Sequence, residues 1–157
     1  MLLFELTDAF TKAKLKYAVV GGYALALHGI VRATMDVDFV LSLTQSDFEL
    51  AEKTLGKIGL QSRLPVRAQD IIKMRKEYIE ERNLIAWSFV DFKNPTRQVD
   101  ILITRDVKDM DIERISVGGR KIPVASLREL LKMKTESGRP QDLIDIKNIK
   151  TKLNEKK

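Results

Sequence analysis

Two aspartates separated by one residue are the side chains in this sequence best suited to chemistry. Residues 34–43 alternate between polar and apolar types and are rich in β-branched and aromatic residues, which predicts a strand. Side chains alternate faces along a strand, so Asp36 and Asp38 should share one face while Val37 and Phe39 point into the core. Neighbouring carboxylates repel each other unless they share a cation, and hard oxygen ligands favour Mg²⁺ or Mn²⁺, which often carry a polyphosphate. The alternative is a pair of exposed or salt-bridged strand residues, because a bare D-x-D motif often arises by chance.

A pair of glycines shortly before the acidic strand is suited to binding phosphate. Gly21 and Gly22 lie between residues 17–20, a predicted strand, and residues 23–28, a predicted helix. Without Cβ atoms they let a phosphate approach the backbone, and the helix that follows directs free amide groups and the positive end of its dipole at an anion. A tight turn would need the same two glycines, so the pair alone leaves both interpretations open.

The composition limits the kind of site and the kind of partner. The 157 residues include no cysteine and one histidine, which excludes disulfides, thiolate zinc sites and cysteine nucleophiles, so a metal would be bound by oxygen. The net charge of +6 favours an anionic partner such as a nucleotide or RNA, although basic residues spread over a soluble surface would give the same total. Neither a membrane-spanning stretch nor a signal peptide is evident, so a cytoplasmic protein is expected.

The remaining pattern predicts an α/β or α+β fold, in which a mixed β-sheet carries flanking helices within a single domain of residues 1–157. The predicted strands cover residues 17–20, 34–43, 84–92, 98–103, 114–117 and 121–124. The predicted helices cover residues 2–14, 23–28, 46–58 and 68–82, then, from about 126, residues 126–137 and 142–153, followed by a lysine-rich tail that should fray.

Turn and capping signals set the expected limits of these elements. Residues 94–95 (Asn-Pro) and 118–119 (Gly-Gly) each separate two strand-like segments, which predicts two antiparallel hairpins. Ser46 and Ser126 are each followed three residues later by a glutamate, a pattern typical of helix N-termini.

The glycine pair and the acidic pair together resemble a known signature. Val20, Gly21 and Gly22, then thirteen residues, then Asp36, Val37 and Asp38 are similar to the G-[GS]…D-x-[DE] signature of the nucleotidyltransferase superfamily related to DNA polymerase β. The wider run GGYALALHGIVRATMDVDFVL resembles AbiEii-type and uncharacterised bacterial nucleotidyltransferases, and RQVDILI, IPVASLRELLKMK and, more loosely, GRPQDLIDI extend the resemblance along the chain. A minimal nucleotidyltransferase fold is therefore expected.

The resemblance implies a third carboxylate on a neighbouring strand. Asp100 lies between β-branched and aliphatic residues and must face something polar, because burying an unpaired carboxylate is costly. Asp91 is the rival, but it lies near the turn and is more simply explained as a strand-end residue. We therefore expect Asp36, Asp38 and Asp100 to be the catalytic and metal-binding residues.

The resemblance also implies a reaction, two-metal transfer of a nucleoside monophosphate from an NTP to a hydroxyl group. Asp36 and Asp38 would hold the metal that carries the triphosphate, and Asp100 would help to hold a second metal and accept the hydroxyl proton. The nucleotide-binding residues would be Gly21, Gly22, Arg32, Thr34 and Lys134, with Arg32 or Lys134 stabilising the leaving pyrophosphate.

The biological setting follows from the resemblance alone. It suggests a toxin–antitoxin or phage-defence enzyme whose acceptor is RNA or tRNA, a protein or a small molecule, with an antitoxin or helical protein as partner. The alternative is a catalytically inactive nucleotide- or RNA-binding module of the same fold, and a third possibility is a basic interaction module. His28 is expected to have a structural role, as a residue at a helix end. Arg139, Asp142 and Asp145 match a carboxy-terminal family motif, although favourable charges at a helix start would explain them nearly as well.

Overall fold

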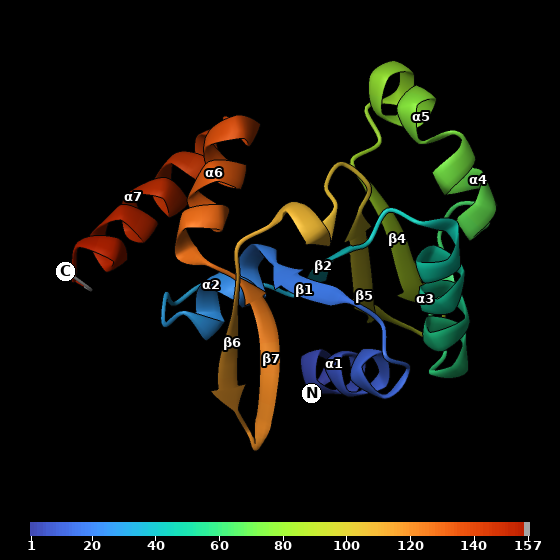
Figure 1. Cartoon of the computed structure of the whole chain (residues 1–157), viewed down its shortest axis with the longest axis horizontal. Helices are drawn as coiled ribbons and strands as arrows, with labels where there is room; N and C mark the ends of the chain where they lie inside the picture. Colours follow the sequence, from blue (N-terminus) through green and yellow to red (C-terminus); the bar gives the residue numbers. More distant parts are fainter. Residues whose placement is uncertain (156–157) are drawn as a thin grey trace.

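A seven-stranded mixed sheet lies at the centre of the computed structural model, which describes residues 1–155 (Figure 1). The last helix continues to Glu155, past its predicted end at residue 153, and the last two residues of the predicted frayed tail, Lys156 and Lys157, lie outside the described residues. The strands are β1 (Tyr17–Val20), β2 (Val37–Leu41), β3 (Gln61–Ser62), β4 (Ala86–Asp91), β5 (Asn94–Leu102), β6 (Ile112–Val117) and β7 (Arg120–Ala125). Their order in the sheet is β3-β4-β5-β2-β1-β7-β6, in which β2–β5 and β1–β7 are parallel pairs and the others are antiparallel. The prediction of a mixed sheet is confirmed.

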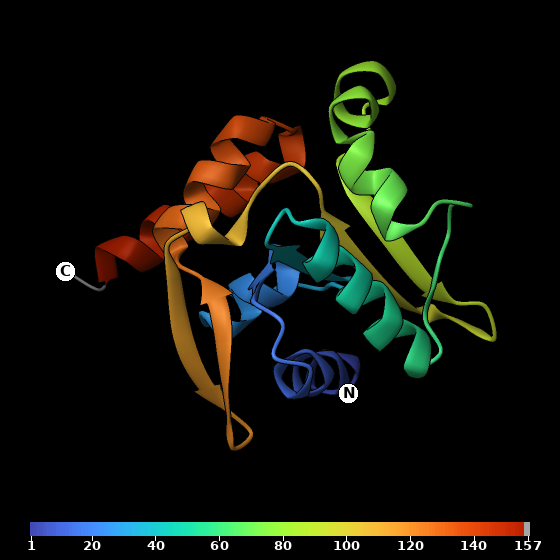
Figure 2. The ribbon, with the colours of Figure 1, turned by 45° about the vertical axis from the view of Figure 1, so that its right-hand side comes forward.

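Helices flank the sheet, as expected, and gather in two groups at its sides. They are α1 (Leu2–Lys12), α2 (Gly21–Leu27), α3 (Gln45–Lys57), α4 (Ala68–Lys73), α5 (Arg75–Arg82), the short 3-10 helix η1 (Val107–Asp109), α6 (Leu127–Ser137) and α7 (Pro140–Glu155). In both views α6 and α7 lie together on one side of the molecule, whereas α4 and α5 lie on the other side (Figures 1 and 2). Within residues 1–155 no helix has the length and apolar character needed to cross a lipid bilayer.

Aromatic side chains fasten α1 and α3 to one face of the sheet. The rings of Phe10 on α1 and Phe39 on β2 meet edge to face, 4.9 Å apart, and Phe48 on α3 stacks on Trp87 of β4 at 5.9 Å. All four side chains are completely buried, so this face forms the core. Because side chains alternate along a strand, the residues next to Phe39 and Trp87 lie on the opposite face, which carries the polar residues described below.

The acidic strand is shorter than predicted. It begins at Val37 rather than at residue 34, so Asp36 directly precedes the strand. The reason is the length of the neighbouring strand: β1 ends at Val20, which pairs with Asp38, and the chain then turns into α2. The residues before Val37 therefore have no partner on that side of the sheet.

Two helix predictions need correction and one is confirmed. The helix expected over residues 68–82 is interrupted at Met74, because α4 packs into the core whereas α5 buries no residue. The third helix is capped by Thr44, not by Ser46, since the Thr44 hydroxyl accepts the backbone N–H three residues later at 3.2 Å. Ser126 caps α6 as predicted, accepting the backbone N–H three residues later at 3.1 Å.

Of the two hairpins, the second is confirmed as predicted and the first is displaced. Gly118 and Gly119 both adopt positive φ and join β6 to β7. The first hairpin turns at residues 92–93, and Asn94 already pairs with Asp91 as part of β5. The two-residue strand β3 has too few residues to show alternation and was not predicted.

Candidate active site

Asp38 and Asp100 lie side by side on parallel strands. Asp38 on β2 is in register with Asp100 on β5. Their neighbours Phe39 and Ile101 are completely buried in the core, so the two carboxylates lie on the opposite face of the sheet. Asp36 is half-buried directly before β2 and approaches the pair from a loop.

The pKa values of Asp36 and Asp38 are raised by burial and by their acidic neighbours. Burial, followed by the charges of Asp100 and Asp36, raises the pKa of Asp38 to about 7, against an opposing effect of Lys134. Burial and the charge of Asp100 also raise the pKa of Asp36, while Arg63 lowers it. The cluster therefore contains like charges that a bound cation would stabilise.

The glycine turn lies so close to this cluster that neither glycine has room for a side chain. Gly21 has φ +70°, and a Cβ there would lie 2.0 Å from the Oδ2 atom of Asp38. A Cβ on Gly22 would lie 2.7 Å from the Cβ of Thr34. The turn that joins β1 to α2 can approach the carboxylate and the loop before β2 this closely only with glycine at both positions.

Polar neighbours that the sequence analysis did not identify hold Asp100 in place. The Ser88 hydroxyl donates to Oδ1 of Asp100 at 2.6 Å, and the side-chain amide of Gln98 donates to the same oxygen at 3.3 Å. The guanidinium of Arg63 in turn donates to Oε1, the side-chain carbonyl oxygen of Gln98, at 3.2 Å. The register of the predicted hairpin would have revealed Ser88, which lies directly opposite Asp100.

Two residues considered from the sequence have structural surroundings instead. Asp91 lies at the end of β4, where it forms an ion pair with Arg97 at 3.2 Å. His28 is buried, and its Nε2 atom lies at hydrogen-bonding distance, 2.8 Å, from the carbonyl oxygen of Ala125. Neither contact involves the acidic cluster.

An ion-pair network connects α6, α7 and the loop before β2. The ammonium group of Lys134 lies 3.2 Å from a carboxylate oxygen of Asp142 and 3.1 Å from one of Asp145. Asp145 also pairs with Arg32, and Asp142 pairs with Arg139 at 3.0 Å. The motif residues of α7 thus hold Lys134 and Arg32, the two cations expected to act on the nucleotide.

The buried carboxylate of this network remains ionised. Burial alone would raise the pKa of Asp142, but hydrogen bonds from Ser137, Arg139 and Lys134 outweigh it and hold the pKa well below its usual range. The side chain of Asp142 is fully buried, so its charge depends on these partners.

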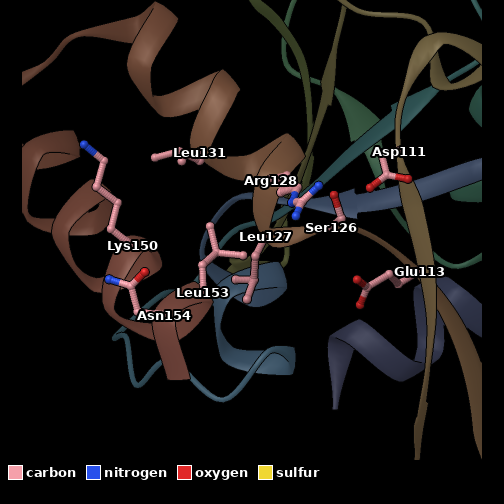
Figure 3. A pocket seen from close by; sticks show the side chains of 9 residues that line it. All are labelled: Asp111, Glu113, Ser126, Leu127, Arg128, Leu131, Lys150, Leu153 and Asn154. Atoms are coloured by element: carbon pink, nitrogen blue, oxygen red, sulfur yellow. The ribbon is translucent and has the colours of Figure 1, made fainter. Parts of the chain in front are cut away.

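A cavity opens beside Asp38 and Gly21. It has a volume of about 570 Å³, and α6 contributes Leu130, Met133 and Lys134 to its wall. A second cavity of about 720 Å³ lies between β6 and the helices α6 and α7 (Figure 3). None of the predicted site residues within residues 1–155 lines this larger cavity, so cavity size alone does not locate the site.

The acidic cluster has the chemistry of a magnesium site without being a complete one. Within the described part of the chain, no three Asp, Glu or His side chains are arranged closely enough to hold a metal by themselves. Mg²⁺ usually binds one or two carboxylates and takes its other ligands from water and substrate phosphates. The oxygen-only donors, the mutual repulsion of the carboxylates and the cavity beside Asp38 all fit such an ion.

Comparison with known proteins identifies a family. The model of the family described as "Nucleotidyl transferase AbiEii toxin, Type IV TA system" matches residues 2–155. A search of curated proteins finds no match.

Solved structures share the fold at low sequence identity. The lincosamide antibiotic adenylyltransferase LnuA, solved with lincomycin, has a TM-score of 0.63 and 17% identity over 95% of this chain and 94% of that one. The antibiotic-resistance factor ANT(2″)-Ia has a TM-score of 0.63 and 11% identity over 94% and 80% of the two chains. An antigenic nucleotidyltransferase-like protein from Paracoccidioides brasiliensis has a TM-score of 0.59 and 17% identity over 95% and 72%. These similarities establish a nucleotidyltransferase fold.

Proposed function

Because the chain belongs to the AbiEii family of nucleotidyl transferase toxins of type IV toxin–antitoxin systems, we propose that Asp36, Asp38 and Asp100 form the centre that transfers a nucleoside monophosphate from an NTP to a hydroxyl group. Family membership makes the protein a nucleotidyltransferase and implies a nucleotide substrate and an antitoxin. The observation that carries the proposal is the in-register pair of Asp38 and Asp100 beside a glycine turn with no room for a Cβ.

The carboxylates would share the work of binding and proton transfer. When bound by Asp36, Asp38 and Asp100, Mg²⁺ or Mn²⁺ would neutralise the triphosphate and lower the pKa of the acceptor hydroxyl. Asp100 accepts the hydroxyl proton, while the hydroxyl oxygen forms a bond to the α-phosphorus and the bond to pyrophosphate breaks. The hydrogen bond from Ser88 fixes the orientation of Asp100 and leaves Oδ2 for this step.

The nucleotide would lie between the glycine turn and α6. Gly21 and Gly22 provide backbone that a phosphate can approach, and Thr34 lies against Gly22. Lys134, whose charge already lowers the pKa of Asp38, and Arg32 stabilise the negative charge that develops on pyrophosphate. Both cations are held by carboxylates of α7, so they need little reorganisation when the nucleotide binds.

The proposal is tested by label transfer from each labelled NTP in the presence of Mg²⁺ or Mn²⁺. Total RNA or total protein serves as the acceptor. Asp38→Asn and Asp100→Asn should each reduce transfer roughly 100-fold or more, because they remove charge that acts directly on the reacting groups. Asp91→Asn is the matched control, since it neutralises the rival aspartate at the strand end and should leave transfer within a few-fold of wild type.

The outcomes separate the candidate functions. Transfer that survives both Asp38→Asn and Asp100→Asn would contradict the site assignment. Wild-type protein that binds an NTP with Mg²⁺ but transfers no label to RNA, tRNA, protein or small hydroxyl compounds would favour a catalytically inactive nucleotide-binding module.

A further inference from the structure

The strand order divides the site into two sides. On one side of the Asp38–Asp100 pair lie β1 and the glycine turn, and on the other side lie β4 and β3. Arg63 directly follows β3 on this second side, and its backbone N–H donates to the carbonyl oxygen of Ser88 at 2.9 Å. If the glycine turn binds the phosphates of the NTP, the second side is where the acceptor must enter.

Arg63 differs from the other cations around the site in its partners. Arg32, Lys134 and Arg139 are each paired with a carboxylate of α7, and Arg105 is paired with Glu136. Arg63 is exposed, and no carboxylate of residues 1–155 lies within salt-bridge distance of its guanidinium. A guanidinium without a carboxylate partner is well suited to bind phosphate in a bidentate manner.

Hydrogen bonds join this cation to the group that takes the proton. The side chain of Gln98 accepts from Arg63 at 3.2 Å and donates to Asp100 at 3.3 Å. The positive charge of Arg63 also lowers the pKa of Asp36. An anion bound to Arg63 would therefore lie one side chain away from the position of the attacking hydroxyl.

We propose that Arg63 binds a phosphate group of the acceptor, next to the hydroxyl that is modified. The acceptor is then a phosphate-bearing molecule, either the end of a nucleic-acid strand or a phosphorylated small molecule. This inference rests on the proposed function, because the side that carries Arg63 is the acceptor side only if the NTP occupies the glycine turn.

Binding measurements on Arg63→Gln test the proposal without relying on turnover. Wild type and variant are titrated with a short single-stranded oligoribonucleotide, a nucleoside 5′-monophosphate and the unphosphorylated nucleoside, each with Mg²⁺ and a non-hydrolysable NTP analogue. The control variant is Arg67→Gln, which removes the same charge four residues along, where Glu52 pairs with the guanidinium at 3.0 Å. Affinity for the NTP analogue is measured separately for every variant.

Arg63→Gln should weaken binding of the phosphate-bearing probes roughly tenfold, the value of one hydrogen bond to a charged group. For the oligoribonucleotide it should also lower the salt dependence of binding by about one phosphate contact. Arg67→Gln should leave the affinity and the salt dependence unchanged, and Arg63→Gln should change affinity for the NTP analogue much less than affinity for the phosphate-bearing probes. A loss seen with the monophosphate and the oligoribonucleotide supports a single phosphate as the ligand, whereas a loss confined to the oligoribonucleotide supports a nucleic-acid strand.

The proposal is overturned if Arg63→Gln binds both phosphate-bearing probes as wild type does. It is also overturned if wild type binds neither phosphate-bearing probe. Failure of the proposed function appears elsewhere, as loss of NTP-analogue binding in wild type or as transfer that survives substitution of Asp38 and Asp100.

Discussion

Replacing Asp38 with asparagine should stabilise the metal-free protein while abolishing its activity. In the folded state burial and the charges of Asp100 and Asp36 raise the pKa of Asp38 from its ordinary 3.8 to about 7. Between these two values the folded state binds more protons than the unfolded state, so the free energy of unfolding falls as the pH rises through this range. Asparagine keeps the shape of the side chain but cannot ionise. The variant therefore does not lose stability as the pH rises through this range.

The size of the effect follows from the same two values. A rise in the pKa from 3.8 to about 7 means that the free energy of unfolding is lower by at most about 4 kcal/mol when Asp38 is ionised than when it is protonated. Asp38 is half-buried, and solvent screening at such a position reduces the effect to about 1–3 kcal/mol. The difference in stability between Asp38→Asn and wild type should therefore be near zero at about pH 4 and reach this value above about pH 7.

The difference in stability between Asp38→Asn and wild type is measured by urea unfolding. A chelator is present, and the pH is varied between these limits. Asp91→Asn is the control of opposite sign, because it removes one of the two carboxylates that pair with Arg97 and should destabilise the protein slightly at neutral pH. Added Mg²⁺ should stabilise wild type more than Asp38→Asn, since binding to the folded state alone raises its stability. A stability difference that does not change with pH, or an Asp38→Asn variant less stable than wild type at neutral pH, would refute this reasoning.

Three further substitutions test the surroundings of the site. Asp142→Asn should cost about 3 kcal/mol at neutral pH, because it removes one of the two carboxylates that pair with the largely buried ammonium group of Lys134. Since the pKa of Asp142 is held low, the acid unfolding curve of the variant should lack the loss of stability that wild type shows below about pH 4. Gly21→Ala should cost about 1–3 kcal/mol in urea unfolding, and it should abolish transfer, because its Cβ would overlap the carboxylate of Asp38. His28→Ala should lower the stability by about 1–3 kcal/mol, because it leaves the buried carbonyl of Ala125 without its partner, yet the transfer rate of the folded fraction should stay within a few-fold of wild type.

Elements with several alternating residues were predictable from sequence, and short or polar ones were not. The strands around Val19, Phe39 and Ile101 were expected, since each buries apolar side chains in the core. The strand β3 has two residues and no pattern to detect. The break at Met74 carries neither glycine nor proline, and it reflects the different burial of the two helices it separates.

The acidic residues of the proposed site were identified from their residue types, whereas the residues that hydrogen-bond to them depend on strand register. An aspartate in an apolar strand is conspicuous, so Asp38 and Asp100 stood out. Ser88 and Gln98 are ordinary polar residues on strands, and only their positions relative to Asp100 give them a role. The position of Asp36 before the strand was missed although the end of β1 at Val20 was predicted, because the sequence does not give the register that pairs Val20 with Asp38.

The anchoring of Lys134 and Arg32 by α7 has a consequence for how the protein is made. Arg32 and its partner Asp145 are separated by 113 positions along the chain. On the ribosome, the strands that carry Asp38 and Asp100 therefore emerge well before the carboxylates of α7 that pair with these cations. A chain interrupted before Pro140 contains Asp36, Asp38 and Asp100 but lacks the carboxylates of α7 that pair with Lys134 and Arg32, so under the proposed function we expect transfer only after α7 has been translated.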